Sequence, residues 1–182
     1  MDDNEFDEQH DWGPEETARV AASYYAYWAA PDGPNGDKSR QVREQHFWAE
    51  LRVSEAAMED ALPLEALDAL LHAGDDASPL PAPEHWPPGE WDTVAAYRDS
   101  IGAGPLETLL SSHSDRHDAA IAARCRTDPA WAQAAGGVWM DRERWEQLPT
   151  DLQRVILEPP QEPARKPRKR PSKRQDRRGR NR

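Results

Sequence analysis

Two histidines and a cysteine are the residues whose spacing first suggests chemistry. His113 and His117 are four residues apart, and Cys125 follows eight residues later. Two histidines at that spacing on one helical face can bind a transition metal. Ser114, however, is a favourable helix N-cap, which would leave His113 outside the helix. We therefore expect no metal site and no cofactor, and a small enzyme or metal protein with its site near His113–Cys125 stays as an alternative.

No other pattern in the chain is typical of catalysis. The two serines before His113 are its neighbours in sequence, but adjacency does not create a nucleophile–base pair. Gly102 and Gly104 are expected to turn the chain into a short helix, and a Gly-x-Gly without a preceding strand is weak evidence for phosphate binding. Cys125 falls on an apolar helical stripe, where a thiol is usually unreactive. The sequence favours a protein that is not an enzyme.

The strongest chemical signal is a basic segment at the end of the chain. Residues 163–182 carry a formal charge of +10, from eleven Lys or Arg and one acid, whereas the whole chain carries −11 and residues 1–162 carry −21. Basic side chains bind phosphates with release of counterions and need no fixed structure for it, so we expect contact with DNA or RNA. The segment has no aromatic residue, so we expect no base stacking and only a weak sequence preference. The basic residues are Arg165, Lys166, Arg168, Lys169, Arg170, Lys173, Arg174, Arg177, Arg178, Arg180 and Arg182.

Other interpretations of this charge division stay open. The tail could dock on the acids of its own body or of a protein partner, or it could be a nuclear address, since residues 166–174 have that composition. The acidic body could instead imitate a nucleic acid and act as an inhibitor. A DNA-reading helix-turn-helix within residues 53–71 is disfavoured, because its polar positions are acidic and would be repelled by phosphates.

The composition of the body predicts helices. Val, Ile and Thr number only six, three and five, while Ala, Leu, Glu, Gln and Arg dominate the periodic segments. We expect an all-α protein, namely a compact irregular bundle of seven to nine short helices with a disordered basic C-terminal tail. The expected divisions are a flexible acidic N-terminus (1–12), an acidic helical domain (13–158) and a tail that is Pro-rich and then Arg/Lys-rich (159–182).

Local signals place the expected helices. Longer helices are predicted at about 14–30, 39–62, 91–101, 115–126 and 150–157, with shorter ones after Pro63, before Leu110, after Pro129 and around Trp145. Capping residues are expected at Ser114, Asp128 and Asp141, with a capping box at Thr150–Gln153. The buried stripe of the 39–62 helix is predicted to consist of large residues, which are Phe47, Trp48, Leu51, Met58 and Leu62.

The tryptophans divide into two groups. Those on predicted helices are expected to fill the core, and they are Trp28, Trp48, Trp91, Trp131 and Trp145. Those in connectors are candidates for contact with an unidentified protein partner, and they are Trp12, Trp86 and Trp139. The leading hypothesis is a non-enzymatic interaction protein whose body binds a protein partner and whose tail contacts nucleic acid non-specifically.

The sequence offers no sign of a membrane protein. No apolar run approaches the roughly 18 residues that a membrane span needs. The first residues are acidic, whereas a signal peptide begins with a basic segment and continues with an apolar one. A single cysteine excludes an intrachain disulfide. We therefore expect a cytoplasmic protein with no membrane partner, or a nuclear one if the source is a eukaryote or its virus.

Overall fold

The computed structural model describes residues 12–29, 37–75, 93–113 and 115–157. All regular structure within these residues is helical, which confirms the all-α expectation. None of the described helices is both long and apolar enough to cross a membrane. The helices are α1 (Pro14–Ala29), α2 (Asp37–Met58), α3 (Leu64–His72), α4 (Thr93–Ile101), the π-helical turn η1 (Gly102–Leu106), α5 (Glu107–Ser112), α6 (Asp118–Thr127), α7 (Pro129–Gly136), α8 (Arg142–Gln147) and α9 (Thr150–Val155).

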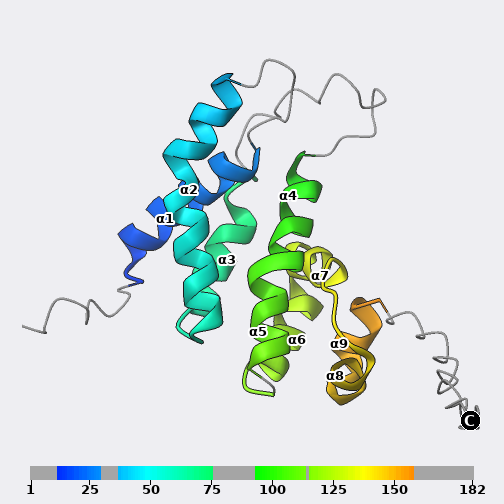
Figure 1. The fold of residues 1–182 in the computed structure, drawn as a ribbon. Coiled ribbons are helices and arrows are strands. Elements are labelled where there is room, and N and C mark those ends of the chain that lie inside the picture. The colour runs from blue at the N-terminus through cyan, green and yellow to red at the C-terminus, as the bar shows by residue number, and fades with distance from the viewer. Residues whose placement is uncertain (1–11, 30–36, 76–92, 114, 158–182) are drawn as a thin grey trace, which may run out of the picture.

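The helices form two groups that pack against each other (Figure 1). Helices α1, α2 and α3 lie on one side, and α4, η1 and α5 run as one bent rod beside them, with α6 to α9 beyond the rod. Contacts between the groups join α1 to α4, α2 to η1 and α5, and α3 to α4 and α7. The contact between α3 and α7 matters most below, because it brings together residues far apart in the sequence.

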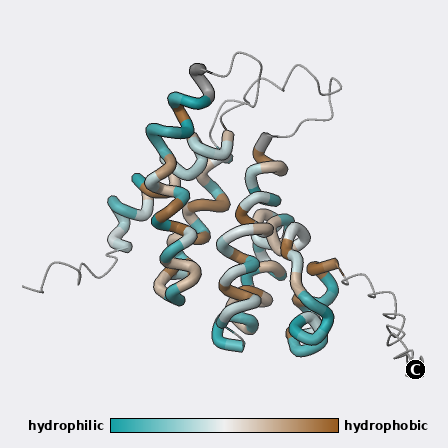
Figure 2. Tube along the Cα trace, viewed as in Figure 1, coloured by the Kyte–Doolittle hydropathy of each residue, from teal (hydrophilic) through white to brown (hydrophobic). Residues whose placement is uncertain are grey.

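One hydrophobic core contains residues from both groups of helices. Tyr97 on α4 packs edge-on against Tyr24 and Tyr25 of α1, with ring centroids 6.2 and 4.9 Å apart, and its hydroxyl donates to the Leu70 carbonyl at 2.8 Å. Hydrophobic stretches recur along the helices in Figure 2, while hydrophilic residues dominate the start of α2 and the region of α8. The largest fully buried side chains are Trp131, Tyr24, Leu67, Leu70, Leu71, Ile101, Leu106, Leu109, Leu110, Ile121, Leu152 and Ile156.

The predicted buried stripe of the 39–62 helix is wrong in part. Leu62, just after α2, is buried and Trp48 is partly buried, as expected, but the other three residues are exposed. The fully buried residues of this helix are small, namely Ala49, Val53, Ala56 and Ala57. Phe47, Leu51 and Met58 lie on the opposite, solvent-facing side and are 44%, 43% and 60% exposed. Small side chains let the backbone of α2 approach α1 and the rod closely, so the fit of neighbouring helices overrides the preference of large apolar residues for burial.

Gly102 and Gly104 were expected to turn the chain after α4, but the helical rod continues through them. Residues Gly102–Leu106 continue it as a π-helical turn with a kink at Gly104 (φ −127°, ψ −105°). A Cβ atom on Gly102 would lie 2.0 Å from the carbonyl oxygen of Ala134, so α7 packs directly on the backbone at this point. The glycine is required for close helix packing, and the two segments stay joined as one rod.

Two of the predicted caps are confirmed and two expectations at other helix starts are wrong. Asp128 and Asp141 accept the amides of Ala130 and Arg144, each at 2.8 Å, at the starts of α7 and α8. The N-cap of α9 is Pro149, which has no side-chain cap, and the side-chain Nε2 of Gln153 instead donates to the carbonyls of Trp145, Glu146 and Leu148 at the end of α8. Helix α6 begins at Asp118, so it is shorter than predicted, and Ser114 lies outside the described residues.

Candidate functional site

Only part of the predicted contact residues lies within the described chain. The eleven basic tail residues and Trp86 lie outside it. Trp139 is 72% exposed, and its backbone amide donates to Glu107 Oε2 at 2.8 Å, so the backbone that carries the exposed ring is tied to α5. Trp12 packs partly against the core, and the Arg52 guanidinium lies 5.3 Å from its ring. Trp139 therefore remains open to a partner, whereas Trp12 has contacts within its own body.

The tryptophans expected in the core are distributed differently. Trp131 is fully buried and Trp48 and Trp145 are partly buried, as predicted, while Trp91 lies outside the described residues. Trp28, predicted to be buried, is 43% exposed. It lies at the end of α1, where the buried face of the helix is instead formed by Val20, Ala21, Tyr24 and Ala29.

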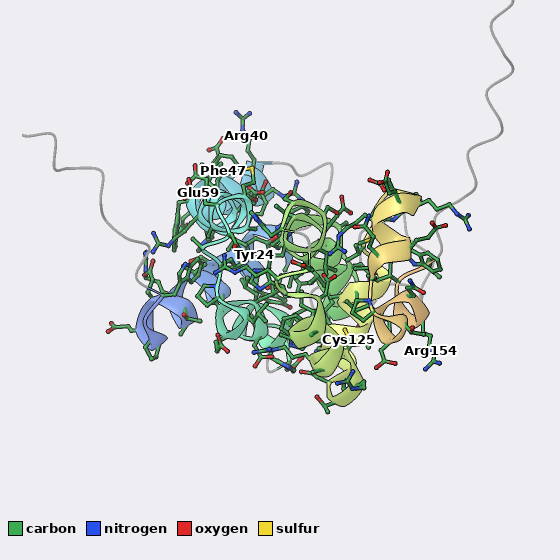
Figure 3. All side chains as sticks on the ribbon, turned by 90° about the horizontal axis from the view of Figure 1, so that it is seen from below. Tyr24, Arg40, Phe47, Glu59, Cys125 and Arg154 are labelled. Atoms are coloured by element: carbon green, nitrogen blue, oxygen red, sulfur yellow. The ribbon has the colours of Figure 1, made fainter. Side chains whose placement is uncertain are left out.

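Trp28 belongs to an exposed group of apolar side chains on α1 and α2. The ring of Tyr27 lies 5.5 Å from that of Trp28 and 5.9 Å from that of Phe47, so aromatic rings connect the two helices. Leu51 lies one turn after Phe47 on the same face of α2. Figure 3 shows Phe47 at the outer edge of α2 and Tyr24 inside the body. We call Tyr27, Trp28, Phe47 and Leu51 the α1–α2 apolar surface.

The three residues of the alternative metal site do not converge on a common position for a metal ion. His113 Nε2 lies 3.0 Å from the Ala57 carbonyl, and His117 Nε2 lies 2.5 Å from Asp60 Oδ1. Cys125 faces a third place, with its sulfur 3.6 Å from the carbonyl of Trp131. Burial raises the pKa of the Cys125 thiol to about 11, which leaves almost no thiolate at neutral pH. Each of these residues therefore has a separate structural contact.

A different histidine lies in a cluster of carboxylates. His72, the last residue of α3, places Nδ1 2.6 Å from Asp75 Oδ2 and Nε2 2.9 Å from Asp128 Oδ2. Asp68 lies one turn earlier on α3, and its Oδ1 accepts the indole N–H of Trp131 at 2.6 Å. Ligand atoms of Asp68, His72 and Asp128 lie within 4.8 Å of one another, and no other such group of three occurs in the described part of the chain.

The charges of this cluster are arranged around the imidazole. The hydrogen bond to Asp75 is the largest influence on His72 and raises its pKa. Burial lowers the pKa, but the contributions of Asp75 and Asp128 together outweigh it. Burial would raise the pKa of Asp128, but hydrogen bonds from His72 and the Ala130 amide lower it overall. Arg98 pairs with Asp75 and also donates to the Leu71 carbonyl at 3.2 Å. The His72 and Asp75 side chains are each 41% exposed, so solvent reaches the cluster.

The sequence offered a partial signal for this cluster. Asp68, His72 and Asp75 share the last turns and the end of one predicted helix, and Asp128 is a recognisable N-cap. Nothing in the local sequence connects His72 with Asp128. The link between the two segments depends on the packing of α3 against α7, which spans more than fifty residues of sequence and has no local signature.

Negative charge is less concentrated in the described helices than in the body as a whole. The described residues contain twenty acids and twelve bases, so they carry −8 of the −21 on residues 1–162. Many of these acids form ion pairs, such as Asp118 with Arg144, Asp151 with Arg126 and Glu146 with Arg142. The described surface is thus a mixture of both signs.

Comparison of the chain with known proteins yields no relative. No family model, no curated protein and no solved structure matches it.

Proposed function

We propose that this chain is a non-enzymatic interaction protein whose helical body binds a protein partner and whose basic tail contacts DNA or RNA non-specifically. The observation that carries the proposal is the division of charge. All twelve basic residues of 1–162 lie among twenty acids in the part of the chain that the structure describes, whereas the eleven in residues 163–182 have one acid beside them. A run of this kind favours phosphate contact without sequence preference.

The two parts would act together through their connection in one chain. The tail supplies a weak, salt-sensitive attraction to a polyanion, and the body supplies selectivity for a second macromolecule. The body, with −8 on its described residues, repels bare nucleic acid and so does not compete with the tail for it. The combination would recruit the partner of the body to nucleic acid.

The α1–α2 apolar surface is the part of the body best suited to a protein partner. Trp28, Phe47 and Leu51 are each more than 40% exposed, and aromatic side chains dominate the binding energy of protein interfaces. Contiguous exposed apolar side chains on a protein surface often mark sites of contact with another protein. The occupant we propose is an apolar face of another protein.

A nucleic-acid mimic is the less supported alternative. A mimic needs carboxylates that are free to meet a basic cleft, and several described carboxylates are already neutralised by arginines of the same chain. A tail of +10 would also occupy an acidic mimic surface or repel its basic target.

Fluorescence anisotropy with labelled DNA and RNA tests the tail. The full chain is compared with a full-length variant in which the eleven tail bases are replaced by Gln, across a series of salt concentrations. We expect binding by the natural chain alone, with log affinity falling by about 0.9 per phosphate contact on duplex DNA as log salt rises. Equal binding by both chains, or no binding at low salt, would refute the proposed role of the tail.

Surface variants test the body. Binding of a partner to the tail-neutralised chain should be lost when Phe47→Ser and Leu51→Ser are introduced together. It should be kept in the control variant Leu157→Ser, which changes an equally apolar and 76% exposed residue elsewhere. Circular dichroism melts check that each variant folds. Sedimentation of the purified chain identifies the case in which the partner is a second copy. A partner that ignores the Phe47 and Leu51 changes does not use the α1–α2 apolar surface.

A further inference from the structure

We propose that Asp68, His72 and Asp128 form a binding site for a divalent transition-metal ion that links α3 to α7. The three residues supply one imidazole nitrogen and two carboxylate oxygens from two different helices, all within 4.8 Å. Imidazole favours ions such as Zn²⁺, and the two carboxylates would balance the charge of a divalent ion. This inference is independent of the proposed function, which uses neither helix end.

The backbone holds the three groups in place. Asp68 and His72 are four residues apart on α3, so they share one helical face. Asp128 is the N-cap of α7, and its backbone lies where the helix begins. Trp131, fully buried one turn into α7, connects the two helices by donating to Asp68. The site is therefore built on helix ends that pack against each other, and such elements position ligands more firmly than loops do.

Each of the three groups has one atom held by a neighbour outside the group. The second atoms of His72 and Asp128 are hydrogen-bonded to each other, and that of Asp68 has no partner among the described residues. Asp75 holds Nδ1 of His72, the Ala130 amide holds Oδ1 of Asp128, and the Trp131 indole holds Oδ1 of Asp68. This leaves Nε2 of His72 and Oδ2 of both aspartates as ligand atoms. A histidine that donates its other nitrogen to a carboxylate is the usual arrangement at metal sites, because the hydrogen bond orients the ring.

The distances suit coordination with small adjustments. His72 Nε2 and Asp128 Oδ2 are 2.9 Å apart, and two ligand atoms at zinc bond lengths of about 2.0–2.2 Å lie roughly 3 Å apart or slightly more. An ion would replace the hydrogen bond between these two atoms. Oδ2 of Asp68 has no protein partner among the described residues, so its side chain can turn toward the ion. The exposure of His72 gives the ion a path from solvent and leaves coordination positions for water.

Calorimetric titration with Zn²⁺, Mn²⁺ and Mg²⁺ tests the site. The full chain is purified without a histidine tag and stripped with a chelator. We expect one Zn²⁺ or Mn²⁺ per chain, with weaker binding of Mg²⁺, which has little preference for imidazole. Added Zn²⁺ should also raise the unfolding temperature, because an ion that binds only the folded chain stabilises it. Absence of a stoichiometric ion would overturn the proposal and leave the cluster as a hydrogen-bonded contact between helices.

Conservative variants locate the ion. Asp68→Asn and Asp128→Asn keep the oxygens that accept from Trp131 and Ala130, and Asn is as good an N-cap as Asp, so both variants should fold. Each should weaken Zn²⁺ binding at least about tenfold, and Asp75→Asn should weaken it about 10- to 100-fold by releasing the ring. Glu55→Gln on α2 is the matched carboxylate control and should change nothing. Unchanged affinity in the Asp68 and Asp128 variants would place the ion elsewhere and refute this site.

Discussion

The buried ion pair between α6 and α8 provides the sharpest test of the fold. Arg144 and Asp118 are 7% and 4% exposed, and Arg144 Nη2 donates to Asp118 Oδ1 at 2.6 Å. Nε of the same guanidinium donates to the Leu110 carbonyl of α5, also at 2.6 Å. The buried side chain of Arg144 on α8 therefore contacts both α5 and α6.

The cost of breaking this pair follows from its burial. Asp118→Ala leaves the Arg144 charge buried without a counter-ion, which costs about 3–5 kcal/mol of unfolding free energy. Asp118 also lies in the first turn of α6, where a negative charge contributes a further ~0.3–1 kcal/mol. For a domain of this size, each kcal/mol lowers the unfolding temperature by about 2–4 °C, so the two contributions together predict a decrease of roughly 7–24 °C.

Replacing both partners should cost much less than the two single changes together. In the double variant Asp118→Leu and Arg144→Met no buried charge remains, and the main loss is the donor to the Leu110 carbonyl, which costs about 1–3 kcal/mol. Urea denaturation of the double variant and of its two single variants, Asp118→Leu and Arg144→Met, measures the coupling energy between the two side chains. Glu44→Gln, which removes an exposed partner of Arg40, is the control and should cost under about 0.5 kcal/mol. Single changes below about 1 kcal/mol, or additive changes, would refute the reasoning.

Two further predictions concern packing and reactivity. Gly102→Ala forces a Cβ to 2.0 Å from the Ala134 carbonyl and should cost at least about 1–3 kcal/mol in a urea melt; Gly136→Ala, whose Cβ would lie 3.9 Å from its nearest neighbour, should be neutral or slightly stabilising. Cys125, with its pKa raised to about 11, should react with iodoacetamide at pH 8 about two orders of magnitude more slowly than an ordinary cysteine of pKa about 8.5. Its rate should rise about tenfold per pH unit, and rapid labelling at pH 7 would show that the thiol is not buried as described.

Helix positions were predicted well because their signals are local. The Asp128–Pro129 pair predicts the start of α7, since the aspartate caps the helix and proline suits its first position. Asp141 predicts the start of α8 in the same way. These interactions involve residues two or three apart, so a short stretch of sequence contains all the information needed. Gln153 has two possible local roles, because its side chain can close a capping box with Thr150 or donate to the carbonyls at the end of α8. The sequence alone predicts the capping box, whereas the structure has the contact with α8.

The buried face of α2 was predicted wrongly because burial depends on the neighbouring helices. Large apolar residues and alanines both recur at helical spacing along α2, so periodicity alone is consistent with either face. The choice is made by α1 and the rod, which approach too closely for Phe47 and Leu51 but accommodate Ala49 and Ala56. This error conceals the α1–α2 apolar surface, since residues assigned to the core are not considered as contacts.

The His72 cluster was missed for a related reason. Asp128 was correctly assigned as a cap, and that role uses one carboxylate oxygen, Oδ1. Its second oxygen contacts His72 across more than fifty residues of sequence, and the same division applies to Asp68, which binds Trp131 with one oxygen and has the other available. A cap or a packing contact explains why each aspartate is present, but it uses only one of the two carboxylate oxygens. Candidate sites are therefore best sought atom by atom, among side chains whose cap or packing role occupies only one of their donors or acceptors.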